Sequence, residues 1–282
     1  MKNFLIITNE MKDKDLAVTQ SVKAHLERNG TNCTIMTNLE SKYQEVPDLP
    51  TELDCALVIG GDGTFLMAAR ILLDRKLPMI GINLGTLGFL ADIEIADLDE
   101  TLDHLLKGDY IIEKRMMLKG YIKDECGEIK KQWSALNDVV ISRSGYSRII
   151  EYNVFANGDW LDTYHSDGVI ISTATGSTGY NLSAGGPIVN PACNVILVTP
   201  VCPHSLANRS VVLSKNDKIE VEVGRLRKSQ KEEAIVTIDG QMAIRLEPGQ
   251  RFYIEREKKT VQLVKIRSKS FAEILRTKMK ND

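Results

Sequence analysis

The sequence has no strong excess of either charge and no unusual composition. Its 36 basic and 38 acidic side chains nearly cancel, so no net field attracts nucleic acid or an anionic membrane, and an anionic ligand must be bound locally. Its apolar fraction of 43% and charged fraction of 26% are ordinary for globular proteins and exclude wholesale disorder or a fibrous repeat. We therefore predict a soluble folded protein that binds neither nucleic acid nor membranes.

The 282 residues also lack a cysteine framework and a long apolar run. The 5 cysteines are odd in number, widely spaced and contain no CxxC pair, which argues against disulfide bonds and against a zinc site. The apolar run nearest the start, residues 4–7, is too short for the core of a signal peptide, and no later run approaches a membrane span. The expected compartment is the cytoplasm.

Strand and helix patterns alternate in the first part of the chain. Three short apolar runs predict buried strands: residues 4–7, 55–59 and 78–82. Apolar residues at helical spacing follow the strands. Asp97 and Glu100 are placed to form a capping box at the start of the last of these helices. Gly30 and Gly108 are natural helix stops. The pattern predicts a Rossmann-like parallel α/β domain over residues 1–108, which binds ligands where its strands end.

The pattern changes after residue 108 to many short β-rich runs. They are separated by four turn signals: Asn157-Gly158, Asn216-Asp217, Asp239-Gly240 and Pro248-Gly249. We expect an all-β, sandwich-like domain over residues 109–267, with a short helix near residues 177–184 and a solvated hairpin loop at residues 225–233. The tail, residues 268–282, regains helical spacing, and we expect it to pack back on the first domain.

A glycine-rich loop, Gly60-Gly61-Asp62-Gly63-Thr64, lies between a predicted strand and a predicted helix. Its glycines allow a tight turn whose N–H groups face one point, so phosphate is the natural ligand. The spacing is neither GxxxxGK[ST] nor GxGxxG, which argues against a P-loop and a dinucleotide fingerprint. A carboxylate beside bound phosphate is unfavourable unless it binds a metal or handles a proton. The alternative is structural, because aspartate at this place commonly caps a helix or forms an Asx-turn.

The loop resembles a signature of NAD kinases, of diacylglycerol and sphingosine-type lipid kinases and, more loosely, of phosphofructokinases. Five further segments resemble NAD kinases in particular: residues 83–92, 136–138, 167–187, 203–206 and 239–241. They follow one another in order over nearly the whole chain. The sequence is thus identified as a member of the NAD kinase family, which transfers a phosphoryl group from ATP or polyphosphate to the 2'-hydroxyl of the adenosine ribose of NAD.

The resemblance implies a catalytic centre built on the glycine loop. Asp62 would accept the ribose proton, and Gly63 would lie beside the ribose. Gly60, Gly61 and Thr64 would complete the phosphate loop. Mg²⁺ or another divalent cation would arrive on the donor phosphates, without a direct protein ligand.

The resemblance also implies a set of NAD-binding residues. Asn137 and Asp138 would hold ribose hydroxyls and adenine, and Asp167 would contact the nicotinamide half. The other expected positions are Arg148, His165, Thr178, Gly179, Tyr180, Asn181, Leu182, Ser183 and Gln241. His165 could instead be a structural histidine of a strand. Met67 stands where some relatives carry a basic residue, which leaves the choice between ATP and polyphosphate open.

Three other functions remain as alternatives. A lipid kinase should show an apolar acceptor pocket or a basic amphipathic face, and the sequence has neither. A noncatalytic dinucleotide sensor would make Asp62 dispensable. A nicotinamide dehydrogenase should carry a GxGxxG loop, which is lacking.

The resemblance, together with the edge strands of an all-β domain, also implies a homo-oligomer, either a dimer or a tetramer.

Overall fold

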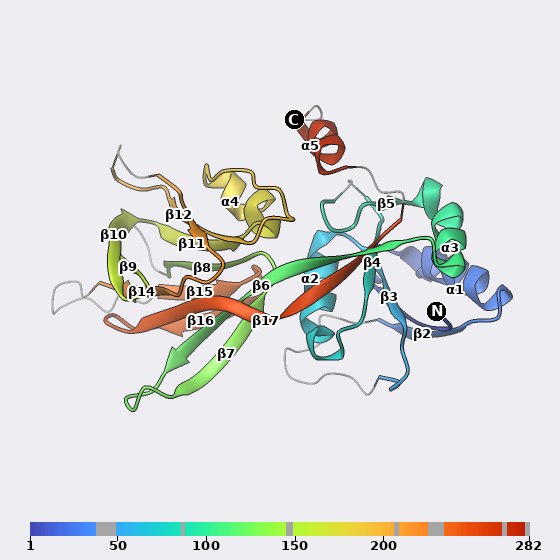
Figure 1. Ribbon diagram of the computed structural model, residues 1–282, viewed down its shortest axis with the longest axis horizontal. Coiled ribbons are helices and arrows are strands. Elements are labelled where there is room, and N and C mark those ends of the chain that lie inside the picture. The colour runs from blue at the N-terminus through green and yellow to red at the C-terminus, as the bar shows by residue number, and fades with distance from the viewer. Residues whose placement is uncertain are drawn as a thin grey trace. The chain divides into compact units, whose positions relative to one another are not determined.

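The computed structural model describes residues 1–37, 49–85, 88–144, 149–205, 209–224, 234–266 and 270–279 (Figure 1). The chain divides into two units: Met1–Lys114 with Thr260–Asp282, and Arg115–Lys259. It passes from the first unit to the second within β6 (Ile111–Lys123) and returns within β17 (Arg251–Lys265). The expected hairpin loop at residues 225–233 lies outside the described residues. No described helix is long and apolar enough to cross a membrane.

The first unit is the predicted α/β domain with a parallel sheet. Its own strands are β1 (Asn3–Thr8), β2 (Asn32–Met36), β3 (Cys55–Gly60), β4 (Met79–Asn83) and β5 (Ile93–Glu94). They pair in parallel in the order β2-β1-β3-β4-β5, and Leu263 of β17 pairs with Met79 of β4. Every residue of β3 and β4 is buried, which explains why these strands read as continuous apolar runs.

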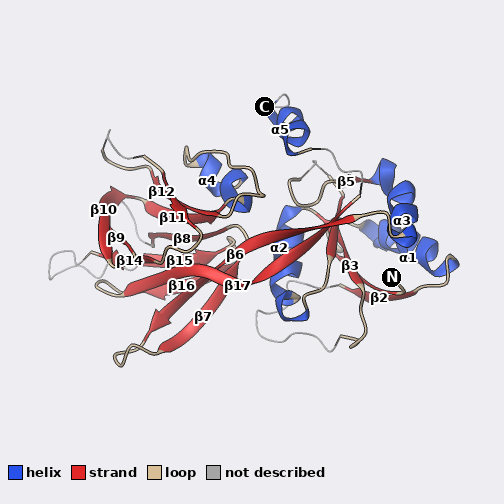
Figure 2. Ribbon diagram, viewed as in Figure 1, coloured by secondary structure: helices blue, strands red, loops and turns tan. Residues whose placement is uncertain are grey.

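Helices cover both faces of this sheet (Figure 2). They are α1 (Ala17–Arg28), α2 (Asp62–Ile71) and α3 (Leu98–Lys107), and the C-terminal helix α5 (Phe271–Met279) belongs to the same unit. Residues of α1 and α3 share one core cluster with alternate residues of β1, β3 and β4. The 3-10 turns of this unit are Lys14–Leu16, Leu73–Arg75 and Ile95–Asp97. The predicted strands and helices are therefore confirmed.

The predicted helix stops are confirmed, but the predicted capping box is wrong. Gly30 and Gly108 adopt φ of 75° and 79°, the left-handed conformation that favours glycine after a helix. Asp97 directly precedes α3, yet its side chain makes no capping hydrogen bond to the described helix residues. Residues Ile95–Asp97 already form a 3-10 turn, so Asp97 has φ −98° and ψ 5° rather than the extended backbone that a capping side chain needs.

The second unit is all-β, and its strands form two sheets. One sheet has the order β10-β9-β14-β17-β6-β7, with β7 (Ile129–Ala135), β9 (Ile150–Ala156), β10 (Asp159–Ser166) and β14 (Ile219–Val223). The other has the order β13-β12-β11-β8-β15-β16, with β8 (Asp138–Arg143), β11 (Gly168–Thr173), β12 (Val195–Val201), β13 (Val211–Ser214), β15 (Ala234–Ile238) and β16 (Met242–Leu246).

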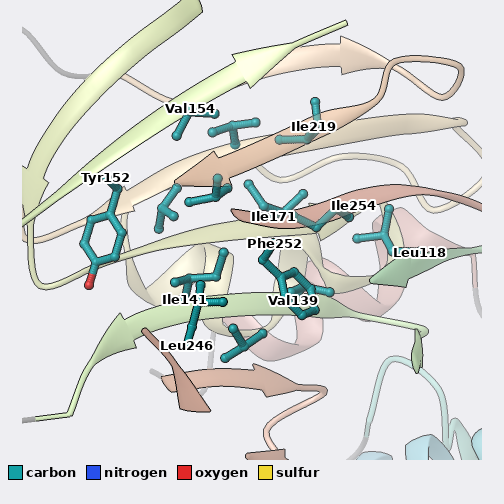
Figure 3. Close-up of a cluster of buried hydrophobic side chains, with 14 of the residues drawn as sticks. Leu118, Val139, Ile141, Tyr152, Val154, Ile171, Ile219, Leu246, Phe252 and Ile254 are labelled. Atoms are coloured by element: carbon teal, nitrogen blue, oxygen red, sulfur yellow. The ribbon is translucent and has the colours of Figure 1, made fainter. Parts of the chain in front are cut away.

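One hydrophobic core joins the two sheets of this unit, as expected for a sandwich. Val154 and Phe252 come from the first sheet, and Ile141 and Ile171 come from the second (Figure 3). Turns at Asn157-Gly158 and Asp239-Gly240 have positive φ at both residues, as tight hairpins require. The short helix is present as a 3-10 turn, Thr175–Thr178, followed by α4 (Tyr180–Ser183), and begins two residues before the predicted start.

Candidate active site

The glycine-rich loop lies where β3 ends and α2 begins. Gly60 is the last residue of β3, Gly61 precedes α2 in extended conformation, and Asp62 is the first residue of the helix. A Cβ at residue 60 would lie 2.5 Å from Thr64 Oγ1, so the packing of Thr64 requires glycine there. Gly63 is exposed. The loop thus places the N-terminal N–H groups of a helix at the carboxyl end of a parallel strand, where anionic ligands bind.

The carboxylate of Asp62 is held by the segment that follows β4. Its Oδ2 accepts a hydrogen bond from the Phe89 N–H at 2.9 Å, and its Oδ1 accepts from the N–H groups of Leu90 and Ala91 at 3.1 and 3.0 Å. The helix-cap interpretation of Asp62 is therefore wrong: Gly61 is the N-cap, and the carboxylate binds another segment. A carboxylate has about four acceptor sites, two on each oxygen. Oδ1 uses both of its sites and Oδ2 uses one, so Oδ2 can accept one more hydrogen bond.

Two signature segments that are distant in sequence meet at this carboxylate. A Cβ at residue 88 would overlap Asp62 Oδ1, so the close approach requires Gly88. The end of the segment is fixed by an ion pair between Asp92 Oδ2 and Lys265 Nζ at 2.5 Å, in which both side chains are almost fully buried. The orientation of Asp62 is thus determined by tertiary contacts rather than by its own helix.

Lys12 lies beside the glycine loop, a position that was not predicted from the sequence. A Cβ at Gly61 would lie 3.1 Å from Lys12 Nζ. The buried carboxylate of Asp13 fixes this part of the chain, because it accepts hydrogen bonds from the N–H groups of Val18 and Thr19 at 3.0 and 2.9 Å. The topology could have indicated Lys12, because residues that follow two neighbouring parallel strands come together. Lys12 follows β1, the glycine loop follows β3, and β1 pairs with β3.

In the second unit, a second aspartate binds the segment that carries Asn137 and Asp138. The Asp239 carboxylate accepts hydrogen bonds from the N–H groups of Leu136, Asn137 and Asp138 at 2.9, 2.8 and 3.1 Å. Asp239 occupies the hairpin turn between β15 and β16 with φ 50°. In the sequence Asp239 stands out only as part of a motif, so its positioning role was not predicted.

Asn137 and Asp138 present buried acceptor groups. Burial, and next the charge of Asp239, raise the pKa of Asp138 from its ordinary value to about 7. The Oδ1 of Asn137 is buried and has no hydrogen-bond partner among the described residues. An unpaired buried acceptor costs about 1–3 kcal/mol, so this pair suits a ligand that offers N–H and O–H donors.

The turn that follows β11 packs directly on Asn137. A Cβ at Gly176 would overlap the Asn137 carbonyl oxygen, and a Cβ at Gly179 would lie 3.5 Å from Asn137 Nδ2. Thr173 links the two segments, since its Oγ1 donates to the Leu136 carbonyl at 2.7 Å and accepts from the Gly176 N–H at 3.0 Å. Glycine at residue 176 thus allows the turn to approach the Asn137 backbone, whereas a Cβ at residue 179 would make only an ordinary contact with the Asn137 amide.

Tyr180 lies near the same acidic group. Its side chain is 47% exposed. Burial is the largest cause that raises the pKa of its phenol, and the charges of Cys202, Asp167 and Asp138 raise it further. Tyr180 is thus partly accessible, and its ring is free to stack on a ligand.

Asn181, which was expected to contact NAD, is fully buried and serves the protein itself. Its Nδ2 donates to the carbonyl oxygens of Ser177 and Pro187, each at 3.1 Å, and its Oδ1 accepts from Thr199 Oγ1 at 2.7 Å. These bonds use both donors and one acceptor site of the amide. Asn181 thus stabilises the turn around it, and its expected contact with NAD stays a prediction. Leu182 and Ser183 are exposed beside it, and Thr178 is half-buried.

Among the remaining predicted residues, Asp167 lies close enough to Tyr180 for its charge to raise the pKa of the phenol, and His165 and Gln241 make other contacts. Asp167 Oδ1 pairs with Arg143 Nε at 2.8 Å. His165 is largely exposed on β10, with its Nε2 3.5 Å from Glu151 Oε2. Gln241 follows the Asp239-Gly240 turn, and its N–H donates to the Ile238 carbonyl at 2.9 Å. Arg148 lies outside the described residues.

The described residues thus contain two groups of predicted site residues, one in each unit. The first is the glycine loop with Asp62, and the second comprises Asn137, Asp138, Gly179 and Tyr180. Within the described part of the chain, no three His, Cys, Asp or Glu side chains are grouped so that they could hold a metal ion.

Comparison with known proteins relates both units to one family. The family model described as "ATP-NAD kinase N-terminal domain" matches residues 4–110, and that described as "ATP-NAD kinase C-terminal domain" matches residues 136–266. The chain is 46% identical over 281 residues to an NAD kinase of Lachnoclostridium phytofermentans, with 99% of each chain covered. It is 41% identical over 294 residues to an NAD kinase of Lachnospira eligens, covering 99% of this chain and 100% of the relative.

Two solved structures share the fold. A yeast NADH kinase complexed with NADH superposes with a TM-score of 0.85 at 23% identity and covers 99% of this chain and 88% of its own. An NAD kinase from Archaeoglobus fulgidus in complex with ATP superposes with a TM-score of 0.76 at 22% identity and covers 99% of this chain and 98% of its own.

Proposed function

Because the chain belongs to the NAD kinase family, we propose that it transfers a phosphoryl group from ATP or polyphosphate to the 2'-hydroxyl of the adenosine ribose of NAD, giving NADP. The observation that carries the proposal is the fixed carboxylate of Asp62 in the glycine loop, with one acceptor site left on Oδ2. A carboxylate held in this way is suited to receive a proton from a hydroxyl group.

The second unit supplies the groups for NAD. Ribose hydroxyls and the exocyclic amine of adenine are donors, and the buried Oδ1 of Asn137 and the carboxyl of Asp138 are acceptors. Tyr180 offers an exposed ring for stacking. We assign Asp167, Thr178, Gly179, Leu182 and Ser183 to the surroundings of the ligand, with His165, Gln241 and Arg148 at its periphery.

The first unit supplies the groups for the phosphoryl donor. The N–H groups at the start of α2 and the ammonium of Lys12 would bind the donor's phosphate oxygens. Mg²⁺ bound to the donor would neutralise part of the phosphate charge and lower its repulsion from Asp62. We propose that the metal arrives bound to the donor phosphates.

The chemical step then follows from alignment. The 2'-hydroxyl oxygen forms a bond to the terminal phosphorus of the donor while the bond from that phosphorus to the bridging oxygen breaks, and ADP or a shortened polyphosphate leaves. The hydroxyl proton passes to Asp62 Oδ2. An ordinary carboxylate is a weak base, but a loose transition state needs proton removal only late, so orientation of Asp62 matters more than basicity.

The test is incubation of the protein with NAD and Mg²⁺ and with either ATP or polyphosphate, followed by an enzymatic measurement of NADP. We expect NADP with at least one donor. The noncatalytic sensor predicts NAD binding without NADP, and a hydride-transfer assay tests the dehydrogenase. Phosphorylation of a diacylglycerol or sphingosine vesicle instead of NAD would favour the lipid kinase. We also propose that the enzyme acts in the cytoplasm, as expected for a chain whose 5 cysteines are odd in number and widely spaced.

A further inference from the structure

The C-terminal helix α5 packs on the residue that holds Asp62. The Phe89 ring centroid lies 6.1 Å from that of Phe271, at the start of α5, with the rings tilted by 44°. Lys278, one residue before the end of α5, has its Nζ 4.8 Å from the Phe89 centroid. The backbone N–H of Phe89 donates to Asp62 Oδ2. Two side chains of α5 thus fix the ring of a residue whose backbone binds the carboxylate.

The three N–H groups that hold Asp62 differ in what fixes them. Leu90 and Ala91 are 2% and 1% exposed, so the core of the first unit holds their N–H groups, which bind Oδ1. Phe89 is only partly buried, and its contacts with α5 are the ring contacts described for it. The backbone of the segment is also closed by a hydrogen bond from the Gly88 N–H to the Ala91 carbonyl at 3.0 Å, so the ring of Phe89 is the part of the segment whose described contacts come from α5.

We propose that α5 is a positioning element for the catalytic carboxylate: by fixing Phe89, it orients the Oδ2 oxygen that receives the ribose proton. This inference rests on the proposed role of Asp62. Oδ2 is the oxygen with an acceptor site still available, so a shift of the Phe89 N–H changes where the carboxylate presents that site. Misplacement of a reacting group by about 1 Å costs on the order of a hundredfold in rate.

The experiment compares Phe271→Ala with Arg276→Ala in the full-length chain. Arg276 is exposed on the same helix, and the described ring contacts of Phe89 come from Phe271 and Lys278, so Arg276→Ala is the control on α5. With saturating ATP and Mg²⁺, Phe271→Ala should lower kcat for NADP formation by about ten- to a hundredfold. KM for NAD should change by less than about twofold, since the NAD-binding groups are untouched. Phe271→Tyr, which keeps the ring, should restore kcat, and Arg276→Ala should behave as the wild type.

A second measurement does not depend on catalysis. Amide hydrogen exchange of the segment Phe89 to Ala91 should become faster in Phe271→Ala, and not in Arg276→Ala. If Phe271→Ala fails to fold, Phe271→Leu and Lys278→Ala are measured in its place. Unchanged kcat together with unchanged exchange would overturn the proposal, and so would a loss of kcat that Phe271→Tyr does not restore.

A double-mutant cycle separates this proposal from the proposed function. If α5 acts through Asp62, Phe271→Ala should cause no further loss of kcat in an Asp62→Asn background. A loss as large as in the wild-type background would overturn the positioning role. If Asp62→Asn alone kept wild-type kcat, the proposed role of Asp62 would fail, whereas the exchange measurement would still report whether α5 holds the segment.

Discussion

At the scale of single residues, two aspartates bind a distant backbone segment in the same way. Asp62 and Asp239 each accept three hydrogen bonds from consecutive backbone N–H groups of a segment far away in sequence. In the first unit the carboxylate is the group that is positioned, and in the second the positioned group is the segment with Asn137 and Asp138. Hydrogen bonds to an ionised carboxylate are stronger than neutral ones, so each set of three bonds stabilises its arrangement.

Asp138 predicts a specific pH dependence of stability. Its pKa is raised to about 7 in the folded protein, first by burial and then by the charge of Asp239, while an unfolded aspartate titrates near pH 4. The stability contributed by its protonation is therefore present below about pH 4 and is lost as the pH rises through about 7. Asp138→Asn abolishes this loss.

Thermal melts of the ligand-free protein between pH 5 and pH 8 test this expectation. As the pH rises, the Tm of the wild type should fall relative to that of Asp138→Asn. Asp159→Asn, at an exposed position of β10, should show no such trend. A difference for Asp138→Asn that stays constant over this range would contradict the assigned burial penalty.

Lys12 predicts a selective effect on the phosphoryl donor. Lys12→Gln removes the ammonium beside Gly61 and should raise KM for ATP about tenfold, since a hydrogen bond to a charged group contributes about 1.5–3 kcal/mol. KM for NAD should not change, and Lys12→Arg should restore ATP use. Lys14→Gln, an exposed lysine of the same segment, is the control. A Lys12→Gln variant that raised KM for NAD and ATP equally would argue against a donor contact.

At the scale of secondary structure, what the sequence predicted was local. The buried strands β1, β3 and β4 follow from apolar runs, and the ends of α1 and α3 follow from Gly30 and Gly108. The capping box at Asp97 failed because a 3-10 turn had already fixed the backbone. The partners of Asp62 and Asp239, and the place of Lys12, could not be predicted, because each depends on segments that meet only in the folded sheet.

The hairpin turn between β15 and β16 predicts a test of the segment that carries Asn137. In Asp239→Asn an NH₂ group replaces one acceptor oxygen, so the N–H of one residue from 136 to 138 loses its partner. We expect a loss of about 1–3 kcal/mol in stability and a higher KM for NAD. Asp217→Asn changes another turn aspartate, which binds the Ser214 N–H, and should leave KM for NAD unchanged. If Asp239→Asn bound NAD as well as wild type, the turn would have no part in positioning the site.

At the scale of the whole molecule, the sheets of the second unit leave edges that a second copy could cover. Among the described strands, β10 pairs only with β9 and β13 only with β12. Trp160 on β10 and Val212 on β13 are 63% and 53% exposed, so both edges present an apolar side chain. We therefore predict a homo-oligomer, a dimer or a tetramer. Light scattering at micromolar concentration should give a mass of at least two chains, and a monomer alone would contradict the prediction.

The proposed mechanism depends on Asp62 as the acceptor of the ribose proton. The most direct measurement is kcat for NADP formation by Asp62→Asn at saturating NAD, ATP and Mg²⁺, with a thermal melt of the same sample. One amide N–H of the 89–91 segment loses its acceptor in this variant, so stability should fall by about 1–3 kcal/mol. Loss of the proton acceptor should lower kcat by about 10²- to 10⁴-fold, or roughly 3 to 5 kcal/mol of barrier. A folded Asp62→Asn protein that formed NADP at the wild-type rate would contradict the mechanism.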